Sequence, residues 1–338
     1  MSGEALQTPG VAAERPARMR ALVAERYGID ALELKEIETP ALPDDRILVR
    51  VRAASLNKLD WYSLNGTPLA ARVMTGIRRP KSRLTGHDFA GIVETVGKDI
   101  HDFQPGDEVF GANTGAFAEV VRTMEGRVAP KPANLSFEEA SAVPIAALTA
   151  LQGLRDHGQV QPGQHVLVHG ASGGVGTFAV QIAKVLGAEV TAVCSTRHVV
   201  QARALGADHV VDYVKEEISR SGRRFDVIMH VGGHLSWWRC RRILAPEGRL
   251  IMAGATGSSF LGPLGYLART WLASLPSSRT ASFFIAKFNR PDLDVIRELL
   301  ESGQVKPVVE KRYELGDVAD ALRYLGEGHA RGKIVVTV

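Results

Sequence analysis

The sequence contains little cysteine, no long apolar run and almost no excess of charge. Cys194 and Cys240 are the only cysteines among its 338 residues. Two thiols exclude a disulfide framework and a structural zinc lobe built from four cysteines, and they fit a reducing compartment. No segment approaches the ~20 apolar residues of a membrane span, because glycine, proline and arginine interrupt the best candidate, 260–275. The net charge of +4 is too small to indicate a nucleic-acid surface.

The first 18 residues differ in composition from the rest of the chain. They lack the apolar core of a signal peptide, and they include Glu4 and Glu14, which argues against a transit peptide. We therefore expect residues 1–18 to form a disordered tail and the protein to be cytoplasmic.

The rest of the chain divides into three parts by its pattern of apolar residues. From 19 to 135, short runs such as ILVRVRAASL and AGIVETVG alternate with Gly, Pro and Asp, which predicts a small, bent antiparallel domain. From 136 to 289, predicted strands and helices alternate after a capping box of Ser136 and Glu139. That order predicts right-handed crossovers and a parallel sheet. Residues 290–338 return to a helix, a strand, another helix and a terminal strand, KIVVTV.

Four glycines lie between a predicted strand and a predicted helix in HVLVHGASGGVG, residues 165–176. Gly170, Gly173 and Gly176 are spaced G-x-x-G-x-x-G, and the following helix has one apolar face and ends at Gly187. A bare backbone at a helix N-terminus offers free N–H groups to a pyrophosphate. A tight turn without a ligand is the alternative, but the strand–loop–helix setting favours dinucleotide binding. The predicted contacts are Ser172, Gly173, Gly174, Val175 and Gly176.

The end of the next predicted strand, EVTAVC, indicates which dinucleotide binds. An NAD site places an acid there to bind the ribose 2′-hydroxyl, whereas this chain continues with Ser195, Thr196 and Arg197 and has no acid before Asp208. Two hydroxyls and a guanidinium suit a 2′-phosphate, so NADPH is the predicted cofactor. The alternative is that Ser195 only caps the next helix and Arg197 is solvated.

Five motifs together resemble the medium-chain dehydrogenase/reductase superfamily, and the resemblance covers nearly the whole chain from Met19. They are GHDFAGIVETVG (86–97), PGDEVFG (105–111), GASGGVG (170–176), LGADHVVDY (205–213) and GHARGKIVVTV (328–338). The resemblance implies an α/β protein in which a Rossmann domain, a doubly wound parallel sheet, is inserted in a GroES-like, mainly antiparallel β catalytic domain. The expected division is 19–135 and 290–338 for the catalytic domain and 136–289 for the NADPH-binding domain.

A catalytic zinc is not expected, although the best-known branch of this superfamily has one. That branch uses a Cys, the His of a GHE motif and a third ligand. This chain keeps Gly86, His87 and Asp88, but Asn57 stands at the place of the Cys, and the region of the third ligand, PIAALTALQGL, has no ligating side chain. We therefore predict no metal and interpret His87 as a structural residue.

The zinc-free pattern is similar to the quinone oxidoreductase branch, which implies catalytic roles for Asn57 and Tyr62. Tyr62 is expected to donate to the acceptor oxygen and Asn57 to position the nicotinamide ribose or the substrate; two polar residues that merely line a cleft are the alternative. The resemblance implies further cofactor contacts. These are Thr149 facing the nicotinamide, Tyr213 beside the 2′-phosphate, Val231 and Gly254 at strand ends, and His329 and Lys333 over the cofactor.

Three functions remain open at this point. The favoured one is an NADPH-dependent reduction of a quinone or an α,β-unsaturated carbonyl, in which hydride enters a conjugated system that needs no zinc. The second is an enoyl-thioester reductase with the basic run 78–83 at its entrance. The third is an NADPH-binding protein with little turnover and a structural or regulatory role.

The apolar segment ASFFIAKF, residues 281–288, is predicted to be the sixth strand, at an edge of the Rossmann sheet. The resemblance implies that two such edges meet in a homodimer. The alternative is that residues 260–279 cover the edge and keep the protein monomeric.

Overall fold

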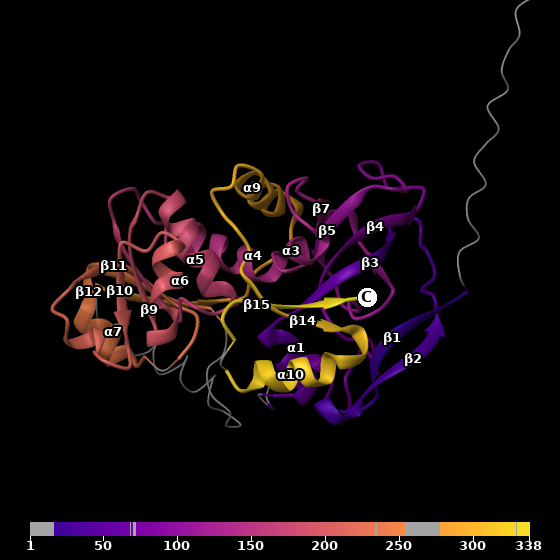
Figure 1. The fold of residues 1–338 in the computed structure, drawn as a ribbon, viewed down its shortest axis with the longest axis horizontal. Coiled ribbons are helices and arrows are strands. Elements are labelled where there is room, and N and C mark those ends of the chain that lie inside the picture. Colours follow the sequence, from indigo (N-terminus) through magenta and orange to yellow (C-terminus); the bar gives the residue numbers. More distant parts are fainter. Residues whose placement is uncertain (1–16, 68, 70–71, 234, 254–277, 329) are drawn as a thin grey trace, which may run out of the picture.

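The computed structural model contains two sheet-based domains that lie side by side (Figure 1). The amino-terminal and carboxyl-terminal segments share one domain, and the middle of the chain forms the other. The structure describes residues 17–67, 69, 72–233, 235–253, 278–328 and 330–338. The predicted tail, 1–18, falls almost entirely outside these ranges.

The middle of the chain forms a six-stranded sheet in which every pair of neighbouring strands is parallel. The strand order is β10-β9-β8-β11-β12-β13, so the chain proceeds outward from β8 in one direction and from β11 in the other. This confirms the predicted doubly wound sheet, whose switch point between β8 and β11 is where such folds bind ligands. The strands are β8 (His165–His169), β9 (Glu189–Cys194), β10 (His209–Asp212), β11 (Phe225–His230), β12 (Leu244–Ala253) and β13 (Thr280–Phe284).

Helices cover both faces of this sheet because its strands are apolar on both sides. On one face, α5 buries Phe178 and Ile182 in a core shared with α4 and α9. On the other face, α7 buries Trp237 and Cys240 against β11 and β12. The helices of this part are α4 (Pro144–Gln152), α5 (Gly174–Val185), α6 (Val199–Ala204), α7 (Trp237–Ile243) and α9 (Arg290–Glu301), with a π-helical turn η4 (Gly153–His157) and 3-10 turns η5 (Thr196–His198) and η6 (Ile218–Arg220).

The second domain is built around a seven-stranded sheet of order β14-β15-β3-β4-β5-β7, with β6 beside β3. All of its pairings are antiparallel except β14 with β15, which agrees with the predicted GroES-like, mainly antiparallel domain. The terminal strand β15 pairs with β3, so the end of the chain completes a sheet begun near its start. The strands are β3 (Ile47–Leu56), β4 (Asp88–Val96), β5 (Glu108–Ala112), β6 (Val120–Thr123), β7 (Val128–Pro130), β14 (Val309–Glu314) and β15 (Lys333–Thr337).

A separate hairpin of β1 (Arg18–Ala24) and β2 (Leu32–Glu38) packs beside this sheet, and sequence reasoning missed β2 because its LELKEIE pattern is largely charged. The predicted capping box of Ser136 and Glu139 is confirmed at the start of α3. The remaining helices are α1 (Lys58–Asn65), α2 (Arg72–Thr75), α3 (Phe137–Ser141) and α10 (Val318–Gly326), with the 3-10 turns η1 (Ile29–Ala31), η3 (Glu125–Arg127) and η7 (Leu315–Asp317).

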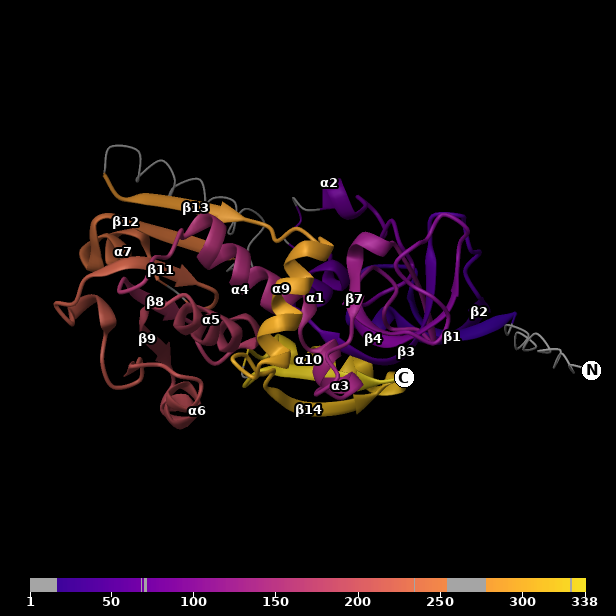
Figure 2. The ribbon, with the colours of Figure 1, turned by 90° about the horizontal axis from the view of Figure 1, so that it is seen from above.

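Strand β13 is the outer strand of the parallel sheet, as predicted (Figure 2). Phe283 and Ile285 are 40% and 77% exposed along this edge. Most of the segment 260–279 that was considered as a cover lies outside the described residues, and the homodimer stays a prediction. Within the described ranges, no helix combines the length and the apolar character needed to cross a membrane.

Candidate functional site

The glycine loop joins β8 to α5 at the carboxyl edge of the parallel sheet. Gly170 has φ +91°, a conformation that side chains other than glycine rarely adopt. At Gly176 a Cβ would lie 2.1 Å from the carbonyl oxygen of Gly170, so only glycine lets the helix start this close to the turn. The turn therefore needs glycine at both positions for its own packing, whether or not a ligand binds.

The other two glycines leave space over the first turn of α5. A Cβ at Gly173 would meet nothing nearer than 3.7 Å, and one at Gly174 would lie 3.0 Å from Lys333 Cδ. Gly173 is the N-cap of α5 in extended conformation, so the first N–H groups of the helix point toward this space. Exposed N–H groups, the positive helix end and a lysine stem suit a pyrophosphate, so the residues present fit the predicted dinucleotide.

The predicted 2′-phosphate residues lie at the ends of β9 and β10. Arg197 is exposed in η5, and Tyr213 is 61% exposed directly after β10. Thr196, however, donates its hydroxyl to Asp212 Oδ2 at 2.6 Å. Asp212 is the residue paired with Cys194 across the sheet, and Lys215 lies 3.7 Å from its carboxylate. The hydrogen bond from Thr196 lowers the pKa of Asp212, so the carboxylate is charged.

Sequence reasoning missed Asp212 because the sequence places it 15 residues after Arg197, on the neighbouring strand. The parallel register of β10 with β9 brings its carboxylate beside Thr196 at the end of β9. Thr196 is thereby engaged by a protein partner, whereas Ser195 makes no capping hydrogen bond with its side chain.

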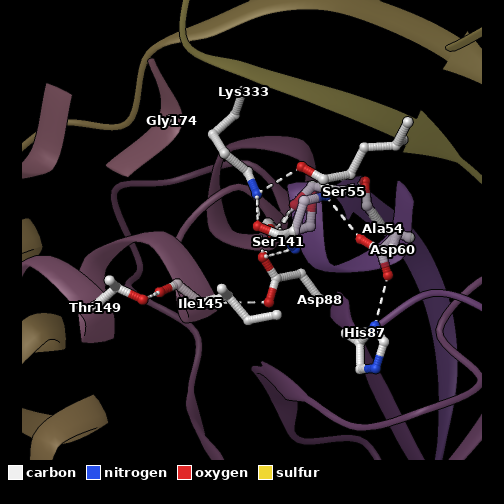
Figure 3. A network of polar contacts seen from close by, with 12 residues as sticks. Ala54, Ser55, Asp60, His87, Asp88, Ser141, Ile145, Thr149, Gly174 and Lys333 are labelled. Atoms are coloured by element: carbon white, nitrogen blue, oxygen red, sulfur yellow. Dashed lines mark hydrogen bonds and ion pairs between the residues drawn. The ribbon is translucent and has the colours of Figure 1, made fainter. Parts of the chain in front are cut away.

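A buried polar cluster lies where the two domains meet (Figure 3). Lys333 Nζ donates to Asn57 Oδ1 at 2.6 Å and to the Leu56 carbonyl at 3.0 Å, and it lies 3.2 Å from Asp88 Oδ2. Asn57 Nδ2 donates to the same Asp88 oxygen at 2.9 Å. Lys333 and Asp88 are 2% and 0% exposed, so this is a buried ion pair bridged by an amide.

Asp88 is held by donors from three elements. Besides Lys333 and Asn57, it accepts from the Ile145 backbone N–H at 3.1 Å, and the Ser55 hydroxyl oxygen lies 3.3 Å from Asp88 Oδ2. The Ser55 hydroxyl donates its one hydrogen to the nearer Ser141 carbonyl, at 2.8 Å, which ties α3 to β3. Burial raises the pKa of Asp88, and the charge of Lys333 and the hydrogen bond from Asn57 oppose that rise. Each charge of the pair is thus compensated by hydrogen bonds, as a buried ion pair requires.

A second pair, His87 and Asp60, extends the cluster. Asp60 accepts from the Asn57 backbone N–H at 2.7 Å and lies 2.6 Å from His87 Nδ1. Asn57 and Asp60 form the capping box that starts α1, so the same residues begin the helix and orient the imidazole. Burial lowers the pKa of His87, but the charge and hydrogen bond of Asp60 outweigh it, and the pKa lies above its ordinary value. The interpretation of His87 as a structural residue agrees with this geometry.

Replacing His87 with Gln should remove a pH dependence of stability. Because the folded-state pKa of His87 is raised above its unfolded value, about 6.5, protonation stabilises the fold fully below that pH. The contribution is lost as pH rises through the folded-state pKa. A glutamine can donate to Asp60 but does not titrate. Urea denaturation should therefore show the free energy of unfolding of the wild-type protein falling relative to that of His87→Gln as pH rises above neutral. Parallel curves for the two proteins would contradict this.

The other predicted site residues lie around this cluster. Tyr62 stands half-buried on α1, edge-on to Trp61 with ring centroids 5.4 Å apart, and burial raises its pKa. Thr149, on α4, donates to the Ile145 carbonyl at 2.7 Å, one turn from the N–H that Asp88 accepts. Val231 directly follows β11. The other two predicted contacts, Gly254 and His329, lie outside the described residues.

Two histidines that sequence reasoning did not consider meet at the switch point of the sheet. His169 ends β8 and His230 ends β11, and their Nδ1 atoms are 3.1 Å apart. His169 Nδ1 also lies 2.7 Å from the Gly232 carbonyl oxygen. The only signal for this pair was that His169 ends one predicted strand and His230 is the last residue but one of another.

Comparisons with known proteins match both domains. Residues 43–133 match the family described as Alcohol dehydrogenase GroES-like domain, and residues 205–336 match the one described as Zinc-binding dehydrogenase. The chain is 32% identical to quinone-oxidoreductase QR1 of Triphysaria versicolor, over 94% of this chain and 98% of that protein. It is 33% identical to the NADPH-dependent alkenal/one oxidoreductase of Arabidopsis thaliana, over 95% and 80%. The structure of a Coxiella burnetii quinone oxidoreductase superimposes with a TM-score of 0.84 at 28% identity, covering 95% of this chain and 99% of that one.

The chain therefore belongs to the medium-chain dehydrogenase/reductase family, and its relatives include quinone oxidoreductases. The resemblance read from the five sequence motifs is confirmed. The two named plant relatives are described as chloroplastic, and a third, from Homo sapiens, as mitochondrial, so the cytoplasmic location stays a prediction.

Proposed function

We propose that this protein is an NADPH-dependent reductase that transfers hydride to a quinone or an α,β-unsaturated carbonyl without a metal ion. The observation that carries the proposal is the closeness of Lys333 to Gly174 (Figure 3): a Cβ on this glycine would lie 3.0 Å from Lys333 Cδ. We call the space over the first turn of α5, beside Gly173 and Gly174, the cradle. Lys333 connects the cradle to the buried cluster, because its ammonium bonds to Asn57 and Asp88. A dinucleotide on the cradle would extend toward the domain junction, where the two predicted catalytic residues lie on and before α1.

Bound NADPH would supply a hydride to an electron-poor carbon of the substrate. The negative charge then develops on an oxygen conjugated with that carbon, and a hydrogen-bond donor stabilises it. Tyr62 suits this role because a phenol is protonated at neutral pH and can donate its hydrogen, and burial raises its pKa further. Asn57 is held at both ends of its amide, by Lys333 and by Asp88. Because the amide nitrogen has two hydrogens, it can donate to Asp88 and to a ligand at once.

The donor set around Asn57 supports a mechanism without zinc. A divalent ion needs several negative or neutral lone-pair donors that are not already engaged. Here the Lys333 ammonium already neutralises Asp88, and Asp60 engages one nitrogen of His87. Among the described residues, no three His, Cys, Asp or Glu side chains are placed to hold a metal. Any ion at this place would have to displace a buried positive charge.

Steady-state oxidation of NADPH with quinones, enones and enoyl-CoA thioesters tests the proposed function. We expect turnover with quinones or enones that survives prolonged chelation, with well under one zinc bound per chain. Preferred turnover of enoyl-CoA would identify an enoyl-thioester reductase instead, and a lack of turnover with every acceptor would favour a binding role. Stoichiometric zinc with chelator-sensitive turnover would contradict the metal-free mechanism.

Arg197→Ala should weaken NADPH binding by roughly tenfold and leave NADH binding nearly unchanged, because a guanidinium forms a charge-assisted hydrogen bond only with the 2′-phosphate. Arg197 lies exposed in η5, next to Thr196 and near the end of β10. Dissociation constants from fluorescence titration with each cofactor measure the difference.

Arg203→Ala is the matched control, because it removes the same charge from an exposed position on α6. It should change both affinities little. Equal losses of NADPH and NADH binding in Arg197→Ala would contradict the assignment of the 2′-phosphate to this residue.

A further inference from the structure

A cavity lies on the Rossmann domain, away from the glycine loop. Its volume is about 500 Å³, within the range of small-molecule pockets. The described residues that line it are Arg224, Trp238, Arg241, Arg242 and Arg279. Four of the five are arginines, and none of them is an acid.

The position of the cavity separates it from the predicted cofactor site. Arg224 directly precedes β11 and Arg279 directly precedes β13, so the cavity lies at the amino edge of the parallel sheet. The glycine loop lies at the carboxyl edge. One strand of six residues separates the two edges, a distance of roughly 20 Å. Helix α7, which carries three of the lining residues, lies at the end of the molecule remote from the catalytic domain (Figures 1 and 2).

The arginines are held in place by the backbone around the end of α7. Arg224 donates through Nη1 to the carbonyl of Arg242, and Arg279 donates through Nε to the carbonyl of Leu244 at 3.1 Å. Backbone carbonyls fix these side chains without neutralising them. Nearby, Glu217 lies 3.2 Å from both Arg220 and Arg239, so its single charge is already shared by two other arginines. The positive charge of the lining is therefore concentrated in the cavity.

The tryptophan adds a flat apolar surface to this charge. Trp237 is 3% exposed and anchors α7 in the core, whereas its neighbour Trp238 is 61% exposed. The guanidinium of Arg241 lies 5.9 Å from the centre of the Trp238 ring. An exposed indole beside arginines can stack on a nucleobase while the guanidiniums bind phosphate oxygens in pairs.

We propose that this cavity binds a nucleoside di- or triphosphate at a site separate from the Rossmann cofactor site. The cavity is open to solvent and has room for a nucleotide, the four guanidiniums match a polyphosphate, and Trp238 matches its base. An acidic peptide or an anionic membrane would also satisfy the charge, but neither requires an exposed indole beside it. The proposal is independent of which acceptor the enzyme reduces.

Calorimetric titration of ADP into the full-length protein, with saturating NADP⁺ to fill the Rossmann site, tests the proposal. We expect one ADP per chain, weaker binding of pyrophosphate and little binding of adenosine. The variant Arg241→Gln/Arg242→Gln should bind ADP at least about tenfold more weakly, because it loses two charge-assisted contacts. The matched control Arg220→Gln/Arg223→Gln removes two charges from the neighbouring exposed segment and should bind ADP as the wild-type protein does.

Trp238→Ala tests the base-binding part. It should weaken ADP binding by roughly fivefold or more and leave pyrophosphate binding unchanged. All substituted side chains are exposed, and thermal unfolding verifies that each variant is folded. The proposal is wrong if no ADP binds in the presence of NADP⁺, if Arg241→Gln/Arg242→Gln binds ADP normally, or if pyrophosphate binds as tightly as ADP. Arginine-dependent binding to phosphatidylserine vesicles without ADP binding would identify a membrane surface instead.

Discussion

Lys333→Met should destabilise the protein by about 3–5 kcal/mol at pH 8, the cost of leaving a buried charge without its partner. Lys333 and Asp88 are both buried, and Lys333 is the only cation among the hydrogen-bond partners described for that carboxylate. Methionine keeps most of the lysine's volume but removes the ammonium. Asp88 then has to remain charged in an apolar setting or take up a proton. Urea denaturation measures the loss.

The defect of Lys333→Met should become smaller at low pH. Without the ammonium, the pKa of Asp88 is raised further above its unfolded value, so the protonated form is favoured in the folded state. The penalty is therefore complete when the pH lies above the folded-state pKa of Asp88. It diminishes as the pH falls through that pKa and is lost below the unfolded-state pKa. Adding Asp88→Asn should restore part of the stability at neutral pH.

Lys58→Met is the matched control for this variant. Lys58 lies at the start of α1 with its side chain exposed; its ammonium donates to the Leu325 carbonyl at 2.8 Å, and no carboxylate pairs with it in the described structure. Its loss should cost about 1 kcal/mol. If both variants lose equal stability, or if the defect of Lys333→Met does not depend on pH, the ion pair with Asp88 is not what stabilises the domain junction.

Two alanine substitutions in the glycine loop should have opposite effects. Gly176→Ala should destabilise the protein by about 1–3 kcal/mol, because its methyl group would lie 2.1 Å from the Gly170 carbonyl oxygen. It should also weaken NADPH binding, since the turn has to move. Gly173→Ala should change stability by less than about 0.5 kcal/mol, because nothing lies within 3.7 Å of the added carbon and the backbone conformation suits alanine.

Gly173→Ala should nevertheless weaken NADPH binding by about tenfold or more, because the methyl group enters the space over α5 where a pyrophosphate would approach. Thermal unfolding without cofactor and fluorescence titration with NADPH separate the two effects. If Gly173→Ala binds NADPH normally, the cradle is not the cofactor site. If Gly176→Ala is as stable as the wild-type protein, the close approach of helix and turn is not rigid.

The sequence determined the parts of the fold that follow from local patterns. Apolar periodicity predicted the six parallel strands with their helices, and the placement of ASFFIAKF after the fifth strand predicted the edge strand β13. Ser136 and Glu139 predicted a capping box because its contacts lie within four residues. The glycine spacing predicted the turn at Gly170 for the same reason. Strand β2 was missed because four of its seven residues are charged and its apolar residues, Leu32, Leu34 and Ile37, do not keep a period of two.

Only the tertiary structure decided which distant side chains meet. The antiparallel pairing of β15 with β3 brings Lys333 to Asn57 and Asp88, across 276 and 245 positions of sequence. The parallel register of β10 with β9 places Asp212 on Thr196, where the sequence alone indicated no acid. A local pattern constrains backbone conformation within a few residues, whereas strand register and domain packing set the contacts between segments. The sequence thus determined a Rossmann sheet inserted in a GroES-like domain, and the pairing of strands decided how its buried charges are neutralised.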